Sequence, residues 1–405
     1  MIDKNLFLEN KIQKRYLRKK IINRFNKKCS SILQNLMVNF DKPNQTLNTL
    51  SKKFKLNFNL KDLKKFQKFN TLVIVGMGGS ILGTEAIYEF LKQKIKKKVY
   101  FIDNIDQNKI LDLKKKIVPK KTLFIIMSKS GNTIETFSNF LSFNIIKKNS
   151  KNIIIISESR NNLLYNISKK FNLFHISHKS FIGGRYSVLS EVGMVPAHLM
   201  GLNIRKFRID LIKNLSKKRK VFLRDSSIKL ANLLHDKKIR NLILLNYAPN
   251  LEKFLFWYQQ LTAESLGKKD FGFLPTISNT PKDHHSLLQL YLDGPKDKLF
   301  YIFSVKEKSF QPINTKKYSN KVNYLHNKNL IKIKDAQKNA LIKSLIKKDI
   351  PYREFIINNF NEETLAELFS YFILETIIIG KLVNINPYNQ PAVEEVKLLT
   401  KKLLG

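Results

Sequence analysis

Short hydrophobic runs alternate with longer amphipathic segments along most of the chain. In the first half, runs with the length of buried strands are separated by segments whose apolar residues recur at helical spacing. These runs lie at residues 71–75, 98–102, 123–127, 152–156 and 173–176. Strands that alternate with helices are typical of a parallel sheet covered by helices on both faces. The pattern therefore predicts a doubly wound α/β domain.

The same alternation recurs in the second half of the chain. Apolar runs at residues 241–245, 299–303 and 352–357 read as buried strands. The segments predicted to be helices around them are residues 251–266, 335–348, 361–380 and 391–403. A second α/β domain of the same class follows from this repetition.

The two ends and the middle of the chain are predicted to be helical. Near the start, Phe7, Leu8 and Ile12 recur at helical spacing, and the middle segment is strongly basic. The predicted organisation is an N-terminal helical segment (1–68), a first α/β domain (69–203), a helical connection (204–238), a second α/β domain (239–385) and a C-terminal helix (386–405). A length of 405 residues agrees with two domains.

The net charge of the chain is +43, from 74 Lys and Arg against 31 Asp and Glu. One interpretation is a protein that binds nucleic acid or another polyanion. However, the basic clusters are scattered along the whole chain, without aromatic–basic interleaving or zinc-finger spacing. We therefore expect solvated surface charge, with no specific nucleic-acid partner.

Other compositional features predict a soluble cytoplasmic protein. Cys29 is the only cysteine, so a disulfide framework is excluded. The N-terminus interleaves charges with apolar residues and offers no signal-peptide region. The most apolar segment, residues 365–379, is too short for a membrane span and contains Glu367 and Glu375.

Two polar turns follow neighbouring predicted strands. The first, residues 76–83, is rich in glycine and contains Gly79 and Ser80. The second contains three hydroxyls and an ammonium group, at Ser128, Lys129, Ser130 and Thr133. Ligands of open parallel sheets bind beyond the carboxyl ends of the strands, and hydroxyls with helix N-termini suit a phosphate. The two turns together predict a site for a monophosphate.

Two other interpretations compete with this phosphate site. Each turn alone is compatible with an ordinary tight turn whose Ser and Thr cap a helix. A nucleotide site is disfavoured, because the first turn lacks the final Gly-Lys-Ser/Thr of a P-loop. Its third glycine is also out of register for a dinucleotide fold.

Six blocks of the chain resemble the signatures of the glucose-6-phosphate isomerase family. The first turn is similar to the family's Gly-Gly-Ser loop, and the other five blocks follow in the family's order. These are SKSGNTIET (128–136), GGRYS (183–187), QLTAESLGK (260–268), HHSLLQL (284–290) and QPAVEEVK (390–397). The resemblance implies two sugar-isomerase-type α/β domains and an aldose–ketose isomerase acting in glycolysis and gluconeogenesis.

The resemblance also implies roles for individual residues. Glu264 is expected to be the base that moves a proton between carbons 1 and 2 through a cis-enediolate. Gln260, one helical turn earlier, is expected to hold the sugar or its phosphate. Arg185 is expected to stabilise the developing negative charge. The alternatives are an ion pair of Glu264 with Lys268, and an arginine bonded only to loop carbonyls.

Ring opening requires an acid, and the resemblance assigns it to His285. The register to Gln289 selects His285 over His284, and Lys397 is expected to assist at the ring oxygen. A capping or core role is the alternative for His285. The family further implies a homodimer in which His285 reaches the partner's site, with no metal or organic cofactor. The expected phosphate ligands are Gly79, Ser80, Ser128, Lys129, Ser130 and Thr133.

Some positions depart from the family pattern. Pro391 and Ala392 stand where larger members have Trp-Gly, and the histidine block lacks an aromatic pair. These departures leave the strictness toward the sugar open. A bifunctional enzyme that also accepts mannose 6-phosphate is therefore one alternative, and a non-catalytic sugar-phosphate-binding protein of the same fold is another.

Overall fold

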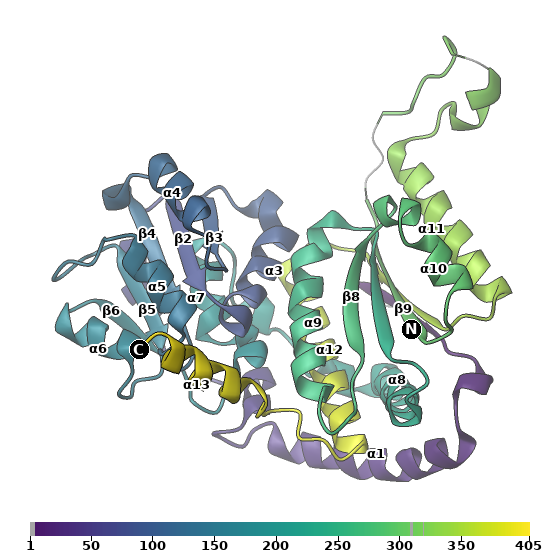
Figure 1. Ribbon diagram of the computed structural model, residues 1–405, viewed down its shortest axis with the longest axis horizontal. Helices are drawn as coiled ribbons and strands as arrows, with labels where there is room; N and C mark the ends of the chain where they lie inside the picture. Colours follow the sequence, from purple (N-terminus) through teal and green to yellow (C-terminus); the bar gives the residue numbers. More distant parts are fainter. Residues whose placement is uncertain (1–4, 308–310, 319) are drawn as a thin grey trace.

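The computed structural model describes residues 5–307, 311–318 and 320–405 and contains two five-stranded sheets. Figure 1 shows the sheets side by side, each flanked by helices, with helices α3 (Leu82–Leu91) and α9 (Glu252–Leu266) between them. The two α/β domains predicted from the alternating pattern are thus confirmed.

The first sheet is parallel throughout and has the strand order β3-β2-β4-β5-β6. Its strands are β2 (Thr71–Gly76), β3 (Lys98–Ile102), β4 (Thr122–Met127), β5 (Ile153–Ser157) and β6 (Phe174–Ser177). One face packs on α4 (Gln107–Lys116), α5 (Ile134–Ser142) and α6 (Leu163–Lys170). The other face packs on α3 and α7 (Glu191–Leu199) and joins the main hydrophobic core.

The strand order of the first sheet reverses between β2 and β4. The chain passes from β2 to β3 on one side and then returns to place β4 on the other side of β2. Such a switch point opens a crevice at the carboxyl ends of the two strands, and ligands of doubly wound sheets bind there. The two predicted phosphate turns leave the sheet at this position, because Gly76 and Met127 are paired at the ends of β2 and β4.

The second sheet repeats the order of the first four strands, and β1 takes the fifth position. Its order is β1-β10-β9-β7-β8, and all pairs except β1 with β10 are parallel. The strands are β1 (Leu6–Lys11), β7 (Asn241–Asn246), β8 (Leu274–Asn279), β9 (Lys298–Val305) and β10 (Tyr352–Ile357). On its outer face lie α10 (Leu288–Asp293) and α11 (Leu330–Lys347).

Two features of the second sheet differ from the sequence-based expectation. Residues 6–11, predicted to be helical, form β1 and pair antiparallel with β10. Leu6 and Leu8 are buried with a period of two because the sheet edge accepts them on one face. Strand β8 was not predicted, since it is an edge strand that contains Pro275 and has Leu274 exposed.

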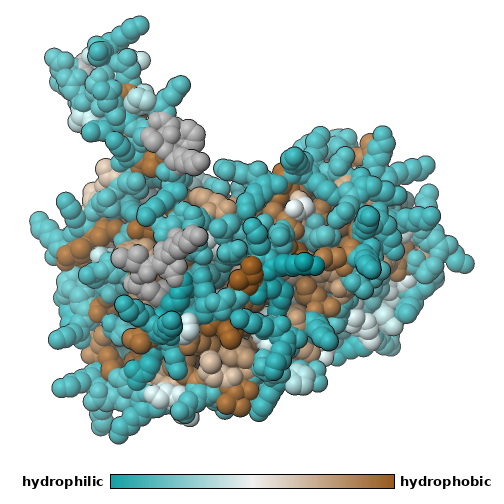
Figure 2. Space-filling model, turned by 180° about the vertical axis from the view of Figure 1, so that it is seen from behind, coloured by the Kyte–Doolittle hydropathy of each residue, from teal (hydrophilic) through white to brown (hydrophobic). Residues whose placement is uncertain are grey.

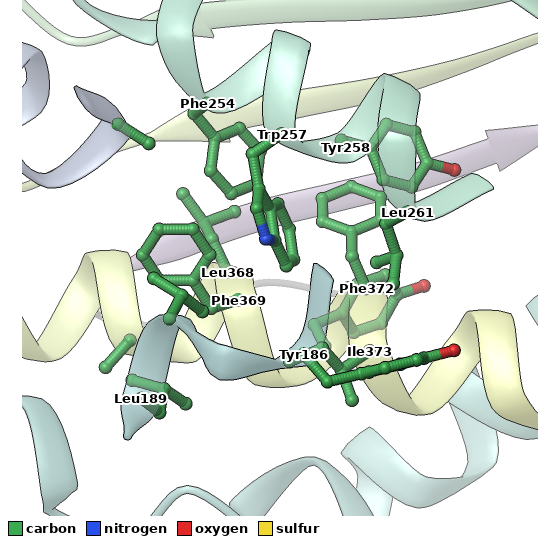
Figure 3. Packing of buried hydrophobic residues seen from close by; sticks show 14 of the residues in the cluster. Tyr186, Leu189, Phe254, Trp257, Tyr258, Leu261, Leu368, Phe369, Phe372 and Ile373 are labelled. Carbon is green, nitrogen blue, oxygen red and sulfur yellow. The ribbon is translucent and has the colours of Figure 1, made fainter. Parts of the chain in front are cut away.

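Long helices form the inner side of the second domain. They are α1 (Lys19–Asn39), α8 (Lys217–Asp236), α9 and α12 (Glu362–Leu382), while α2 (Leu60–Leu63) and α13 (Val393–Leu403) lie outside this group. Figure 3 shows aromatic residues of α9 and α12 facing one another. The ring centroids of Trp257 and Phe369 are 4.7 Å apart, and those of Tyr258 and Phe372 are 4.3 Å apart. This aromatic core fixes α9 against α12.

A buried ion pair ties these helices to the second sheet. The guanidinium of Arg353, on β10, donates two hydrogen bonds to the carboxylate of Glu375 on α12, at 2.8 and 2.9 Å. It also bonds the hydroxyls of Tyr371 and Tyr301. A charge buried this fully is tolerated because each partner is satisfied.

Charged side chains are spread over the outside of the molecule. On the face shown in Figure 2, hydrophilic residues cover most of the surface, with hydrophobic residues in smaller groups between them. The basic clusters lie on different elements, for example in the last turn of α4 and the first turn of α8. Within the described ranges, no helix is long and apolar enough to cross a membrane.

One ion pair at the interface between the domains involves a buried carboxylate. Oε1 of Glu85, on α3, accepts a hydrogen bond from Lys253 Nζ on α9 at 3.0 Å. The Glu85 side chain is 3% exposed, and its Oε2 is buried without a hydrogen-bond partner among the described residues. Burial raises the pKa of Glu85 to about 7 against the opposing effect of the Lys253 ammonium.

This pKa predicts how stability depends on pH. The carboxyl of Glu85 holds its proton more tightly in the folded state than in the unfolded state. Its stabilising contribution to the free energy of unfolding is therefore present at low pH and is lost as pH rises through about 7. Relative to Glu85→Gln, the wild-type chain should lose up to about 3 kcal/mol of unfolding free energy between pH 4.5 and 8. Denaturant titrations across this range measure the difference. Lys253→Met should make the unfolding free energy depend more steeply on pH. If the unfolding free energies of wild type and Glu85→Gln change in parallel with pH, the raised pKa of Glu85 is contradicted.

Candidate active site

The two polar turns lie side by side at the switch point of the first sheet. The backbone N–H of Lys129, in the second turn, donates to Ser80 Oγ of the first turn at 3.4 Å. Within the second turn, the hydroxyls of Ser128 and Thr133 are 2.8 Å apart. Helices α3 and α5 begin directly after these turns, so their N-terminal N–H groups point toward the same region. Hydroxyls and N–H donors thus converge as a phosphate site requires.

The second turn packs against Asn162, the N-cap residue of α6. Gly131 has a positive φ of 68°, and a Cβ there would lie 1.8 Å from Asn162 Oδ1. A side chain at this position is therefore excluded. Lys129 and Ser130, beside it, are partly exposed. Burial lowers the pKa of the Lys129 ammonium, and the Glu158 carboxylate opposes this shift.

The first turn packs directly on the loop that carries Arg185. A Cβ on Gly79 would lie 2.3 Å from the carbonyl carbon of Gly184 and 2.4 Å from the backbone nitrogen of Arg185. The two backbones therefore touch, and only glycine permits this approach. Through this contact, the position of Arg185 depends on the position of the phosphate turn.

The guanidinium of Arg185 is buried and uses all of its donors. An arginine side chain has five N–H groups, and each of them meets an acceptor here. Nε donates to Ser265 Oγ (2.8 Å), Nη1 to Glu264 Oε2 (3.1 Å) and Gln390 Oε1 (2.8 Å), and Nη2 to the carbonyls of Pro387 (2.7 Å) and Asn389 (3.1 Å). Arg185 therefore bonds loop carbonyls, as its structural alternative requires, and also contacts the candidate base.

The carboxylate of Glu264 lies between Arg185 and Gln260. Its Oε1 accepts a hydrogen bond from Gln260 Nε2 at 2.9 Å, and its side chain is 31% exposed. Gln260 in turn lies against the first turn, since a Cβ on Gly78 would be 3.0 Å from its Nε2. Lys268 forms no ion pair with Glu264 among the described residues, so the alternative ion pair is wrong. The result is a closed ring of contacts that joins both domains around one carboxylate.

Two predicted catalytic residues lie elsewhere in the chain. His285 ends a short 3₁₀ helix (Lys282–His285) after the edge strand β8 and is exposed. Within the described ranges it makes no hydrogen bond to Glu264, whereas His284 bonds the hydroxyl of Tyr247 at 2.8 Å. Lys397 lies on α13, where its ammonium pairs with Glu394 at 2.7 Å and its side chain is 60% exposed. The structure thus brings neither side chain to the carboxylate.

Comparison with known proteins identifies the family of the chain. The family model for phosphoglucose isomerase matches residues 21–272, more than half of the chain. The chain belongs to the phosphoglucose isomerase family. The resemblance inferred from the six sequence blocks is thereby confirmed.

Relatives and solved structures extend the similarity over the whole chain. A glucose-6-phosphate isomerase from Methanocaldococcus jannaschii is 33% identical over 362 residues, which cover 85% of this chain and 87% of the relative. One from Campylobacter jejuni is 29% identical, with 82% and 85% covered. Among solved structures, a hypothetical protein from Thermus thermophilus aligns with a TM-score of 0.82 at 22% identity, covering 98% of this chain and 100% of that one. A glucose-6-phosphate isomerase from Chlamydia trachomatis aligns with 0.77 at 16% identity, covering 100% and 89%, so the fold is shared.

Sequence reasoning did not assign a role to several residues around Arg185 in this member of the phosphoglucose isomerase family. Ser265 and Gln390 accept from its guanidinium, and the indole N–H of Trp257 donates to its backbone carbonyl at 3.1 Å. The hydroxyl of Tyr186 bonds Ser265 and the Pro387 carbonyl. Three of these residues lie inside the sequence blocks that resemble the family, namely Ser265, Tyr186 and Gln390. Their place in those blocks is the signal that could have identified them. Trp257 is the only tryptophan of the chain, and the sequence gives no other signal of its role.

The contact between Gly79 and Gly184 predicts that Gly79→Ala damages the site. The added methyl group must push the phosphate turn away from the Arg185 loop, at a cost of about 1–3 kcal/mol in unfolding free energy. Sugar-phosphate binding should weaken along with stability. Gly183→Ala is a matched control, because its Cβ would meet Tyr186 at an ordinary 3.4 Å. Thermal unfolding and binding titrations of both variants make the comparison, and equal behaviour of the two would refute the close-contact argument.

Proposed function

We propose that this protein interconverts glucose 6-phosphate and fructose 6-phosphate as an aldose–ketose isomerase. The observation that carries the proposal is the ring of contacts that holds a solvent-accessible carboxylate beside two phosphate-type turns. Membership of the phosphoglucose isomerase family supports the same reaction.

The reaction transfers a proton between neighbouring carbons of the open-chain sugar. Glu264 takes the proton from carbon 2 of the aldose, which leaves a cis-enediolate, and returns it to carbon 1. Overall, the hydroxyl proton of oxygen 2 moves to oxygen 1, so the aldehyde becomes a hydroxyl and the ketone forms at carbon 2. A single carboxylate can serve both carbons because they share one face of the planar intermediate.

Arg185 stabilises the negative charge of that intermediate. Its Nε and Nη2 donors are bound to Ser265 and to two backbone carbonyls. The Nη1 donors instead meet the side chains of Glu264 and Gln390, which can rotate. The Nη1 group is therefore the part of the guanidinium that can turn a hydrogen bond toward the substrate oxygen while the other donors hold the cation in place.

The phosphate of the substrate occupies the switch point of the first sheet. Ser80, Ser128, Ser130 and Thr133 supply hydroxyls, and Gly79 and Lys129 supply backbone N–H groups. The ammonium of Lys129 adds positive charge at the same place, and Gln260 lies beside the first turn. Because these donors are set by two tight turns and two helix N-termini, the anion is held without a metal ion.

We further propose a homodimer in which His285 completes the partner's site. The exposed position of His285, after an edge strand and apart from Glu264, supports this arrangement. There it protonates the ring oxygen for ring opening, with Lys397 of the exposed helix α13 assisting. The single buried cysteine fits a reducing cytoplasm as the site of action.

Replacing Glu264 by Gln tests the assignment of the base. The amide keeps the size of the side chain and its contact with Gln260 but cannot accept a proton, so kcat should fall by about 10²–10⁴-fold. Binding of fructose 6-phosphate, measured by calorimetry, should persist. The matched control is Glu89→Gln, whose side chain has the same 31% exposure and lies on α3.

Two outcomes would contradict this proposal. Unchanged turnover in Glu264→Gln would remove the residue from its role. Binding of sugar phosphate without any turnover by the wild-type protein would favour the non-catalytic alternative. Turnover of the wild-type protein with mannose 6-phosphate distinguishes a strict enzyme from a bifunctional one.

Mixed dimers test the role of His285. Glu264→Gln and His285→Gln should each be inactive alone, because each removes one group from every site. When the two variants are dissociated and reassembled together, a mixed dimer contains one site with both an intact Glu264 and an intact His285. Isomerase activity should therefore return on mixing. Its absence, in samples shown by native mass spectrometry to contain mixed dimers, would place His285 within its own subunit's site or outside catalysis.

A further inference from the structure

The ammonium of Lys268 links the end of α9 to the C-terminal segment. Its Nζ donates to the carbonyl of Ser265, in the last turn of α9, at 3.1 Å. It also donates to the carbonyl of Asn386 at 2.6 Å. Ser265 is the residue whose hydroxyl accepts from Arg185, and it directly follows Glu264. Lys268 therefore binds the backbone directly after the candidate base and the segment that follows α12.

The segment that Lys268 contacts has no regular secondary structure of its own. Residues 384–392 connect α12 to α13, and cationic side chains hold several of their carbonyl groups. Lys268 binds the carbonyl of Asn386, while Arg185 binds those of Pro387 and Asn389 and the side chain of Gln390. A backbone segment outside helices and sheets keeps its shape only if such bonds are made.

The cations of Lys268 and Arg185 thus bind carbonyl groups of the same short segment. The Arg185 guanidinium needs the carbonyls of this segment in order to remain buried, because an arginine with unpaired donors is costly to bury. Lys268 fixes the residue immediately before them. Losing this anchor would allow the Pro387 and Asn389 carbonyls to move away from Nη2.

We propose that Lys268 is a positioning residue for isomerisation, which acts by clamping Asn386–Gln390 around Arg185. It touches neither the substrate nor the reacting atoms. Lys268 holds the segment, the carbonyls of the segment hold the Arg185 guanidinium, and the guanidinium contacts Glu264. The proposal rests on the proposed function, in which Arg185 stabilises the enediolate.

The surroundings of Lys268 make this clamp sensitive to pH. Burial and the neighbouring Arg185 lower the pKa of Lys268 to about 8, against the opposing effect of the Glu264 carboxylate. The tyrosines nearby do not titrate in this range, because burial raises the pKa of both Tyr186 and Tyr388. Lys129 is a second lysine with a lowered pKa, so variants must show which ammonium is responsible. Loss of the proton from Lys268 weakens a charge-assisted bond to Asn386.

The experiment compares kcat and KM as functions of pH for wild type, Lys268→Arg and Lys268→Met. Wild-type kcat should decline above about pH 8. Lys268→Arg, whose cation does not titrate, should retain most of kcat at pH 7 and move this decline upward by at least one pH unit. Lys268→Met should lose about tenfold in kcat at pH 7 and show no decline of its own near pH 8, with KM little changed. Lys269→Met, an exposed neighbour, is the matched control.

Each alternative result would overturn the proposal. A decline that stays at the same pH in Lys268→Arg would assign it to another group. A Lys268→Met variant with normal kcat, or with reduced kcat and an unshifted decline, would show a merely structural lysine. A readout independent of isomerase activity is hydrogen exchange of residues 384–392, which should be faster in Lys268→Met than in wild type at pH 7. If the wild-type protein lacks isomerase activity, the proposed function fails, while this measurement still decides whether the clamp exists.

Discussion

The buried guanidinium of Arg185 is the interaction on which the rest of the site depends. Taking a permanent cation out of water costs several kcal/mol unless every donor is satisfied. Here five donors meet five acceptors, which come from α9 and from the segment that leads to α13. The arginine itself belongs to the loop packed against the first phosphate turn. One side chain therefore fixes the relative positions of three parts of the chain that are distant in sequence.

Aromatic residues of the surrounding core hold polar groups next to Arg185. The indole of Trp257 donates to the Arg185 carbonyl, and its ring packs against Phe369 of α12 (Figure 3). Tyr186 places its ring in the same core and its hydroxyl on the acceptors of the guanidinium. Rigid rings hold polar groups accurately because they have few rotatable bonds. Preorganisation of this kind lets a cation stabilise a transition state without reorganising during the reaction.

Much of the fold was predictable because its signals are local. Strands β2, β4 and β5 are mostly apolar, which indicates a sheet buried on both faces. The glycines and hydroxyls of the turns after β2 and β4 can be read directly from the sequence. Strand β1 was not predictable in this way, since it pairs with β10, more than 300 residues later. Helix α11 begins at Leu330 rather than near residue 335, because Asn329 caps it and accepts from the Lys332 N–H.

The candidate site also contains residues that the sequence could identify and groups that it could not. Gly79, Ser80, Glu264, Gln260 and Arg185 were identified from short blocks, and the structure brings them together. The carbonyls that hold Arg185 and Lys268 could not be identified, because a backbone carbonyl has no sequence signature. His285 and Lys397 were also named from short blocks, but the structure places both on exposed elements away from Glu264.

Selectivity and attraction therefore have different physical origins in this protein. A net charge of +43 attracts any anion over a distance of about one Debye length, roughly 8 Å at physiological salt, without distinguishing among anions. The site itself adds hydroxyls and backbone N–H groups in fixed directions, and in the proposed function those directions select a phosphate. Inside the protein, positive charge occurs where carbonyls or carboxylates match it, as at Arg185 and Arg353. The surface charge can therefore vary without changing the chemistry, whereas the acceptors of Arg185 cannot.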